Sequence, residues 1–115
     1  MTPYKQGDVV LLPFPFTDLR TIKQRPAVIL STEAFNVRQR DVVVVAITSH
    51  VPSVPNPEDY RLSDVDQRTA GLPKLSIVKC AKLLTIDQRL IRKTLGRLPL
   101  ETFSQLKQRM LAILG

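Results

Sequence analysis

The strongest constraint on the fold is a run of eight residues, 41–48, in the first half of the chain. Its sequence is DVVVVAIT, and six of the eight residues are branched at Cβ. Such side chains favour extended backbone, and a continuous apolar run without polar alternation is typical of a strand buried on both faces. We therefore predict a central strand over Asp41–Thr48, with further strands on either side of it.

Shorter apolar runs predict the neighbouring strands. Asp8–Leu12 follows Gly7, Ala27–Leu30 follows Pro26, and Leu75–Leu84 is a longer run whose alternation of apolar and polar residues is imperfect. Each run has the length and the branched or aliphatic composition of a short strand. We expect five or six short strands in all.

The connections between these runs are rich in residues that break regular structure. Three are expected, at Pro13–Gln24, His50–Asp59 and Asp64–Pro73. Proline has no backbone N–H for a strand ladder, so the prolines of the first two connections predict loops. Loops of about a dozen residues in a compact domain are usually functional or mobile. The site is therefore expected near them.

The last part of the chain has the pattern of a helix. Apolar residues recur at spacings of three and four from Leu100 to Ile113, which predicts an amphipathic helix over Pro99–Leu114. A shorter helical turn is expected after a capping residue at Thr85 or Asp87. Together the elements predict one domain, residues 1–115, of mainly β class, with the terminal helix packed on a small curled sheet or barrel.

The composition excludes several classes of site. The single cysteine, Cys80, rules out an internal disulfide and a cysteine zinc site, is expected to be a small buried residue, and suits a cytoplasmic protein. One histidine and four scattered glycines provide neither a catalytic triad, nor a set of zinc ligands, nor a phosphate-binding glycine loop. We expect no metal and no cofactor. No membrane segment is expected either, because no apolar stretch approaches roughly 18 residues.

The charge is strongly basic and unevenly distributed. The chain has 17 Lys and Arg against 10 Asp and Glu, a net charge of +7. Residues 76–115 alone contain eight basic and two acidic side chains. A basic surplus of this kind favours a polyanionic partner, either a nucleic acid or an acidic protein. An ordinary solvated surface is the alternative interpretation.

Two strand ends carry side chains suited to phosphate chemistry. Arg25 precedes Pro26, which biases it toward extended backbone, and its guanidinium offers a planar fork of donors. Thr48, Ser49 and His50 end the branched run, and histidine is the usual proton carrier near neutral pH. From these residues alone, a solvated arginine and hydroxyls that cap turns through their own backbone remain open interpretations.

Taken together, a set of short motifs resembles the MazF/PemK family of toxin–antitoxin toxins. Each motif is weak alone, but the set occurs in the order and spacing of that family over almost the whole chain. The motifs are Gly7–Asp18, Gln24–Ser31, Val45–Ser49, Ala70–Leu72, Ser76–Val78, Leu83–Asp87 and Leu95–Leu98.

The resemblance implies an SH3-like β-barrel with a C-terminal helix, acting as a homodimeric, metal-independent endoribonuclease. It also implies that the enzyme cleaves single-stranded RNA within short sequences and is silenced by a cognate antitoxin, which is usually acidic. The family's phosphate-stabilising arginine maps to Arg25 and its catalytic threonine to Thr48. Lys79 stands where some relatives have arginine, and Ala81 where many have an acidic residue implicated in proton transfer. The base is therefore left unassigned.

As a hypothesis, the ribose 2′-hydroxyl attacks its own phosphate, giving a 2′,3′-cyclic phosphate. Phe14 or Phe16 would then stack on an unpaired base, although packing in the core is the alternative for both rings. The other candidates for RNA binding are Gln24, Ser49, Lys79 and Lys82. His50, or Arg25 itself, is the candidate for proton transfer.

Two functions of other classes remain open. One is a non-catalytic module that binds nucleic acid or a protein without cutting, for which Ala81 is the main support. The other is a toxin that poisons a topoisomerase, because one barrel fold serves several activities.

Overall fold

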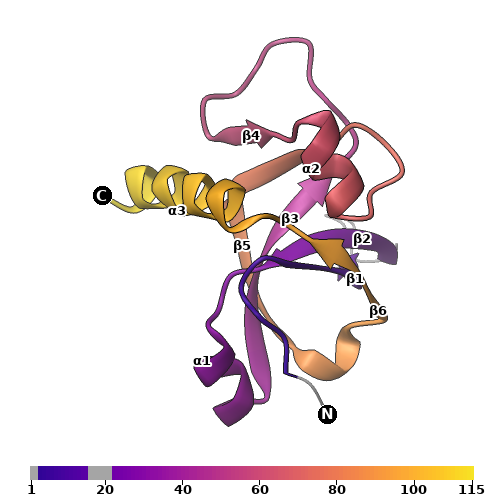
Figure 1. The fold of residues 1–115 in the computed structure, drawn as a ribbon, viewed down its shortest axis with the longest axis vertical. Helices are drawn as coiled ribbons and strands as arrows, with labels where there is room; N and C mark the ends of the chain where they lie inside the picture. The colour runs from indigo at the N-terminus through magenta and orange to yellow at the C-terminus, as the bar shows by residue number, and fades with distance from the viewer. Residues whose placement is uncertain (1–2, 16–21) are drawn as a thin grey trace.

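The computed structural model describes residues 3–15 and 22–115. In these residues six strands form one antiparallel sheet in the order β4-β5-β3-β2-β1-β6 (Figure 1). The strands are β1 (Asp8–Pro15), β2 (Ile22–Ile29), β3 (Asp41–Thr48), β4 (Asp59–Arg61), β5 (Ile77–Asp87) and β6 (Lys93–Arg97). The helices are α1 (Glu33–Arg38), α2 (Asp64–Thr69) and α3 (Leu100–Leu114), with a 3-10 turn η1 (Gln88–Leu90).

The predicted central strand is confirmed. β3 covers Asp41–Thr48 and lies between β2 and β5. Val45 and Ile47 belong to a buried cluster on the side of α3, while Val42 and Val44 belong to a second cluster on the opposite side. Because successive side chains of a strand point to opposite faces, a strand covered on both sides needs apolar residues at every position. This requirement explains the unbroken valine run.

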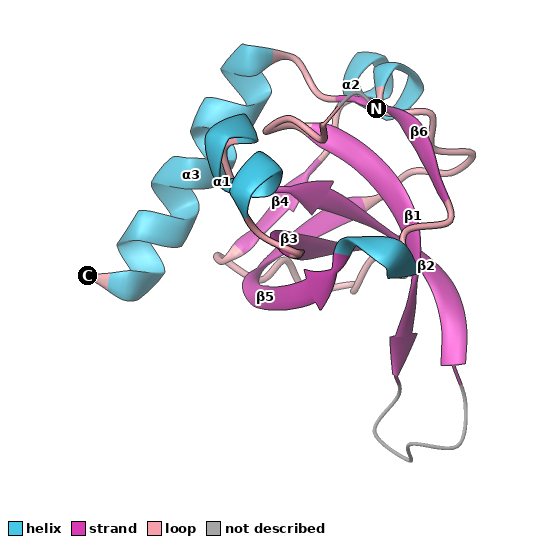
Figure 2. Cartoon of the chain, turned by 90° about the horizontal axis from the view of Figure 1, so that it is seen from below, coloured by secondary structure: helices cyan, strands magenta, loops and turns pink. Residues whose placement is uncertain are grey.

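The predicted mainly β class with a C-terminal helix is also confirmed. α3 begins at Leu100 and buries Phe103, Leu106 and Met110 against the sheet (Figure 2). Leu100 and Ile113 continue the apolar stripe but are 83% and 40% exposed, since they lie toward the two ends of the helix. The sheet curls in a barrel-like manner, with β4 and β6 as its edges (Figure 1).

The prediction of a loop over Pro13–Gln24 is wrong at both ends of the range, because strands extend into it from either side. β1 continues to Pro15 and β2 begins at Ile22. In the described residues β6 pairs with β1 only from Asp8 to Leu11, so the prolines lie where β1 has β2 as its one neighbour. A proline lacks a backbone N–H, and this costs little where no neighbouring strand would accept a hydrogen bond from it.

Several short elements were not predicted. α1 and α2 each form after a polar cap, with Thr32 accepting from Phe35 N and Ser63 accepting from Asp66 N. α2 lies within the expected connection Asp64–Pro73, and β4 begins at the end of the connection that starts at His50. β6 was also missed. Of the two expected caps, Asp87 is confirmed at η1, whereas Thr85 lies inside β5.

The end of α2 packs directly on the backbone of β6. A Cβ at Gly96 would lie 2.8 Å from Ala70 O and closer still to Thr69 O. A Cβ at Gly71, where φ is +74°, would collide with the backbone of Leu95. These two glycines let the two backbones touch. None of the helices within the described ranges is long and apolar enough to cross a membrane.

Candidate active site

Arg25 and Thr48 lie at corresponding positions of neighbouring strands. The ladder between β2 and β3 pairs Ala27 with Ala46. Continued by two residues in the same register, it places Arg25 opposite Thr48. Side chains two residues apart on a strand share a face, so both point to the face of Ala27 and Ala46. The ladder itself ends at the Ala27–Ala46 pair, two residues before these side chains. Arg25 lies inside β2, and Thr48 is the last residue of β3.

The end of β3 forms a local turn through its hydroxyl. Thr48 Oγ1 accepts a hydrogen bond of 3.1 Å from His50 N. Thr48 is half-buried, whereas Ser49 and His50 are exposed. The turn-capping interpretation is therefore present in the structure. It does not use the hydroxyl proton of Thr48, which can still be donated to a ligand.

The other residues expected near Arg25 divide between two faces. β1 pairs Leu12 with Arg25, and Pro13 with Gln24. Because side chains alternate, the exposed Gln24 lies on the face opposite to Arg25. Phe14 is half-buried and packs against a core cluster. Phe16 lies outside the described residues.

β5 changes register beside β3, and Lys79 lies at this irregularity. Ile47 pairs with Val78 and Val45 pairs with Leu83, so the segment 79–82 stands opposite one residue of β3. Cys80 is fully buried in the core, as expected, while Ala81 and Lys82 are exposed. An irregularity of this kind locally re-aims side chains. It explains the imperfect alternation of the sequence.

Lys79 forms an ion pair with Asp59 across the β4–β5 ladder. The two residues are direct partners in the ladder, and Lys79 Nζ lies 2.9 Å from Asp59 Oδ2. Their side chains are 25% and 9% exposed, respectively. The carboxylate is therefore sheltered and held in one orientation.

Arg109 fastens the start of β4 to α3. Its Nη1 donates to Pro57 O at 3.0 Å and to Asp59 O, and its guanidinium lies 5.2 Å from the ring centre of Tyr60. Burial, with a smaller contribution from Asp66, raises the pKa of Tyr60 above 10.0. The neutral phenol donates a hydrogen bond of 3.0 Å to Gln105 Oε1 of α3. The helix thus positions the backbone that carries Asp59.

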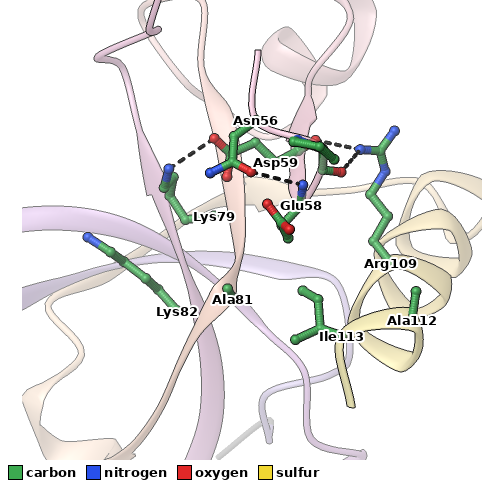
Figure 3. A pocket seen from close by; sticks show the side chains of 10 residues that line it. Asn56, Glu58, Asp59, Lys79, Ala81, Lys82, Arg109, Ala112 and Ile113 are labelled. Carbon is green, nitrogen blue, oxygen red and sulfur yellow. Dashed lines mark hydrogen bonds and ion pairs between the residues drawn. The ribbon is translucent and has the colours of Figure 1, made fainter. Parts of the chain in front are cut away.

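A cavity of about 630 Å³ opens at this edge of the sheet (Figure 3). In Figure 3, Lys79 and Lys82 lie on one side of it, and α3 residues lie on the other. Its lining residues are Asn56, Pro57, Glu58, Asp59, Lys79, Ala81, Lys82, Arg109, Ala112 and Ile113. A smaller cavity of about 90 Å³ lies against Ile77, the ladder partner of Thr48. Asn56 and Asp59 line both cavities.

Charge dominates the chemistry of this region. Lys79, Lys82 and Arg109 contribute cations to the large cavity, and Glu58 and Asp59 contribute carboxylates. Neither Arg25 nor Thr48 is among the lining residues of the two cavities. Lysine and arginine side chains suit an anionic phosphodiester. Across residues 3–15 and 22–115, His, Cys, Asp and Glu form no group of three or more that could hold a metal ion.

Asp59 and Arg109 were missed by sequence reasoning. Asp59 falls at the end of an expected loop, and only the β4–β5 register brings it to Lys79. Arg109 lies off the apolar stripe of α3, which is the one signal that it faces something other than the core. Its hydrogen-bond acceptors, Pro57 O and Asp59 O, lie about 50 residues earlier in the chain.

Comparison with known proteins adds the decisive observation. The sequence profile of PemK-like, MazF-like toxins of type II toxin–antitoxin systems matches residues 5–114. The chain belongs to this family. The resemblance found from its motifs is thereby confirmed. No curated protein sequence matches this MazF-like chain.

Solved structures share the MazF-like fold over almost the whole chain. MazF from Deinococcus radiodurans matches with a TM-score of 0.78 and 23% identity, covering 98% of this chain and 97% of that one. MazE–MazF from the same organism gives a TM-score of 0.76 at 20% identity, covering 100% and 98%. An endoribonuclease in complex with its cognate antitoxin, from a mycobacterial species, gives 0.77 at 20% identity, covering 97% and 95%.

Proposed function

We propose that this toxin is a metal-independent endoribonuclease that cleaves single-stranded RNA. The solved structures with the same fold include proteins named as endoribonucleases. The proposal is supported by the alignment of Arg25 with Thr48 when the register of Ala27 and Ala46 is extended by two residues beyond the β2–β3 ladder. These are the two positions to which the family's catalytic arginine and threonine map.

The geometry suits cleavage by the RNA's own 2′-hydroxyl. The 2′ oxygen attacks the adjacent phosphorus, the bond to the 5′ oxygen breaks, and the products are a 2′,3′-cyclic phosphate and a 5′-hydroxyl. Arg25 would neutralise the charge that develops on the phosphoryl oxygens, and Thr48 would donate a hydrogen bond that orients the phosphate. DNA would be spared because it lacks the attacking group.

The basic surface would bind the rest of the RNA backbone. Lys79 and Lys82 line the large cavity, one half-buried and one exposed. Ser49 and His50 are exposed beside Thr48, where they can contact the ribose or a neighbouring phosphate. Gln24 lies on the face of the sheet opposite to Arg25. It could contact only RNA that extends past the end of β2 to that face.

We further propose that the toxin acts as a homodimer in the cytoplasm and is inhibited by an acidic antitoxin. Two of the three structures compared above contain an antitoxin, MazE in one case and a cognate antitoxin in the other. The net charge of +7 favours an acidic partner on this chain.

The decisive experiment is cleavage of a single-stranded RNA oligonucleotide in the presence of EDTA. We expect cutting to persist, and to stop when a single 2′-deoxynucleotide replaces the residue at the cut. Arg25→Ala should lower the single-turnover rate about 100- to 1000-fold, the usual loss for one stabilising donor. Arg38→Ala removes the same charge from exposed α1 and serves as the matched control, with an unchanged rate.

Three results would count against the proposal. Cleavage that requires added Mg²⁺ contradicts the metal-independent mechanism. Binding without any product over long incubation favours the non-catalytic module, with a salt dependence of about 0.7 log units per phosphate contacted. Growth arrest with intact transcripts favours a toxin that acts on another target.

A further inference from the structure

We propose that Asp59 is the proton acceptor for the attacking 2′-hydroxyl, an inference that rests on the proposed RNA cleavage. Asp59 belongs to β4, a strand that sequence patterns did not reveal. Position 81 of β5 is alanine and supplies no carboxylate to the large cavity. Asp59 supplies one from the neighbouring strand, directly opposite Lys79.

The strand registers place Asp59 on the same face as Thr48. Thr48 pairs with Ile77, and Ile77 pairs with Arg61 of β4. Two residues further along these strands, Lys79 pairs with Asp59. Positions two apart on a strand share a face. Asp59 therefore lies two strand spacings, about 10 Å, and two residues along the strands, about 7 Å, from Thr48, which is about 12 Å between the backbones. A nucleotide that lies across this face can contact the threonine hydroxyl through its phosphate and the carboxylate through its ribose.

The surroundings of Asp59 combine shelter with access. Its side chain is 9% exposed, and the residue lines both the large cavity and the smaller one beside Ile77. The smaller cavity lies against Ile77, the ladder partner of Thr48, so Asp59 connects the large cavity with the Thr48 end of β3. The ion pair uses Oδ2, and a carboxylate has a second oxygen with which it can take a proton.

The charged groups near Asp59 come from three elements. Lys79 of β5 binds its side chain, and Lys82 follows on the same strand at the cavity wall. Arg61 shares its face of β4, and Glu58 precedes it in the chain. Arg109 of α3 binds its backbone carbonyl rather than its carboxylate. Of these groups, Lys79 holds the Asp59 carboxylate and Arg109 holds its backbone. A base must be positioned in this way before it can accept a proton.

The step balances without any further reagent. The O–H bond of the 2′-hydroxyl breaks and its proton moves to Asp59 Oδ1, while the 2′ oxygen forms a bond to phosphorus. The bond between phosphorus and the 5′ oxygen breaks, and the 5′ oxygen takes a proton from solvent. Asp59 then returns its proton to solvent. Lys79 takes no part in the proton transfer and keeps the carboxylate oriented through its contact with Oδ2.

Asp59→Asn tests the base directly, because asparagine keeps the shape and an oxygen that accepts from Lys79 Nζ but is not a base. We expect its single-turnover rate to fall at least 100-fold at unchanged RNA affinity, as for the loss of a general base. Glu33→Gln alters an exposed carboxylate of α1 that lines neither cavity and is the matched control, with a rate close to that of the parent protein. Thermal unfolding of each variant verifies the fold.

A second variant separates proton transfer from a structural role. Asp59→Ala should be inactive, and added formate should restore part of its rate while chloride at equal ionic strength should not. An Asp59→Asn variant that cuts RNA within threefold of the parent rate overturns the proposal. So does a loss of rate that accompanies unfolding and that formate does not restore in Asp59→Ala. A parent protein that does not cut RNA refutes the proposed function itself, which distinguishes the two failures.

Discussion

Replacing Gly96 with alanine tests how tightly the end of α2 is packed on β6. Gly96 lies on β6, and an added Cβ would meet two backbone groups of the α2 end, Thr69 O and Ala70 O. A Cβ in ideal geometry at this position lies 2.5 Å from Ala70 C and 2.8 Å from Ala70 O, against 3.4–4 Å for ordinary contact. Since these atoms belong to the backbone and not to a flexible side chain, the two backbones must separate by about 0.9 Å or more.

The cost of this separation can be worked out in two parts. Overpacking a well-packed contact costs typically about 1–3 kcal/mol, and rigid backbone neighbours favour the upper end. Replacing glycine with alanine also lowers the entropy of the unfolded chain, which adds about 0.4–1 kcal/mol to the free energy of unfolding. The net loss is about 2 kcal/mol in the free energy of unfolding. For a chain of this size that corresponds to a melting temperature lower by about 8 °C.

Urea denaturation and thermal unfolding followed by circular dichroism measure this loss. Gln108→Ala on α3 is the control, because the Gln108 side chain is exposed to solvent. We expect its stability to be unchanged. A Gly96→Ala protein within about 0.5 kcal/mol of the parent, the range of ordinary surface substitutions, would refute the reasoning. The backbone contact between α2 and β6 would then be loose enough to absorb a methyl group.

Two further predictions concern titratable groups. Burial raises the pKa of the Cys80 thiol from 9.0 to about 11, so the native state binds more protons in this interval. The free energy of unfolding should therefore fall as pH rises from 9 to 11, and it should fall less in Cys80→Ala. Labelling of the Cys80 thiol at about pH 8 should be slow until urea unfolds the protein. Hydrogen bonds from Arg89 lower the pKa of Asp87 from 3.8 to about 2. Carboxyl NMR should show this titration, and a low pKa retained in Arg89→Ala would contradict the assignment.

The parts of the fold that sequence patterns predicted correctly are those with a local cause. The valine run of β3 and the apolar stripe of α3 each report burial through the repeat of their own backbone. The prolines of β1 misled the prediction for the converse reason. Whether Pro13 breaks a strand depends on whether a partner needs its N–H, and that depends on how far β6 extends along β1.

The family motifs also separate what is visible locally in the sequence from what depends on contacts between distant residues. Ala70–Leu72 and Leu95–Leu98 were recognised as separate short motifs of the chain. In the structure they meet, because Gly71 and Gly96 allow the backbones of α2 and β6 to touch. A glycine in each motif was visible in the sequence, but the contact that requires both of them was not.

Side-chain periodicity in the sequence was enough to locate the central strand over 41–48 and the helix near the C-terminus, and the sequence also singled out Arg25 and Thr48. It placed Arg25 at the start of a strand, whereas the structure has it inside β2. Tertiary structure alone decided the strand order and register that set Asp59 against Lys79, and the reach of Arg109 to the start of β4. The reason is physical. Periodicity follows from the covalent geometry of a few consecutive residues, whereas a ladder partner is selected by packing and loop closure among residues far apart in the chain.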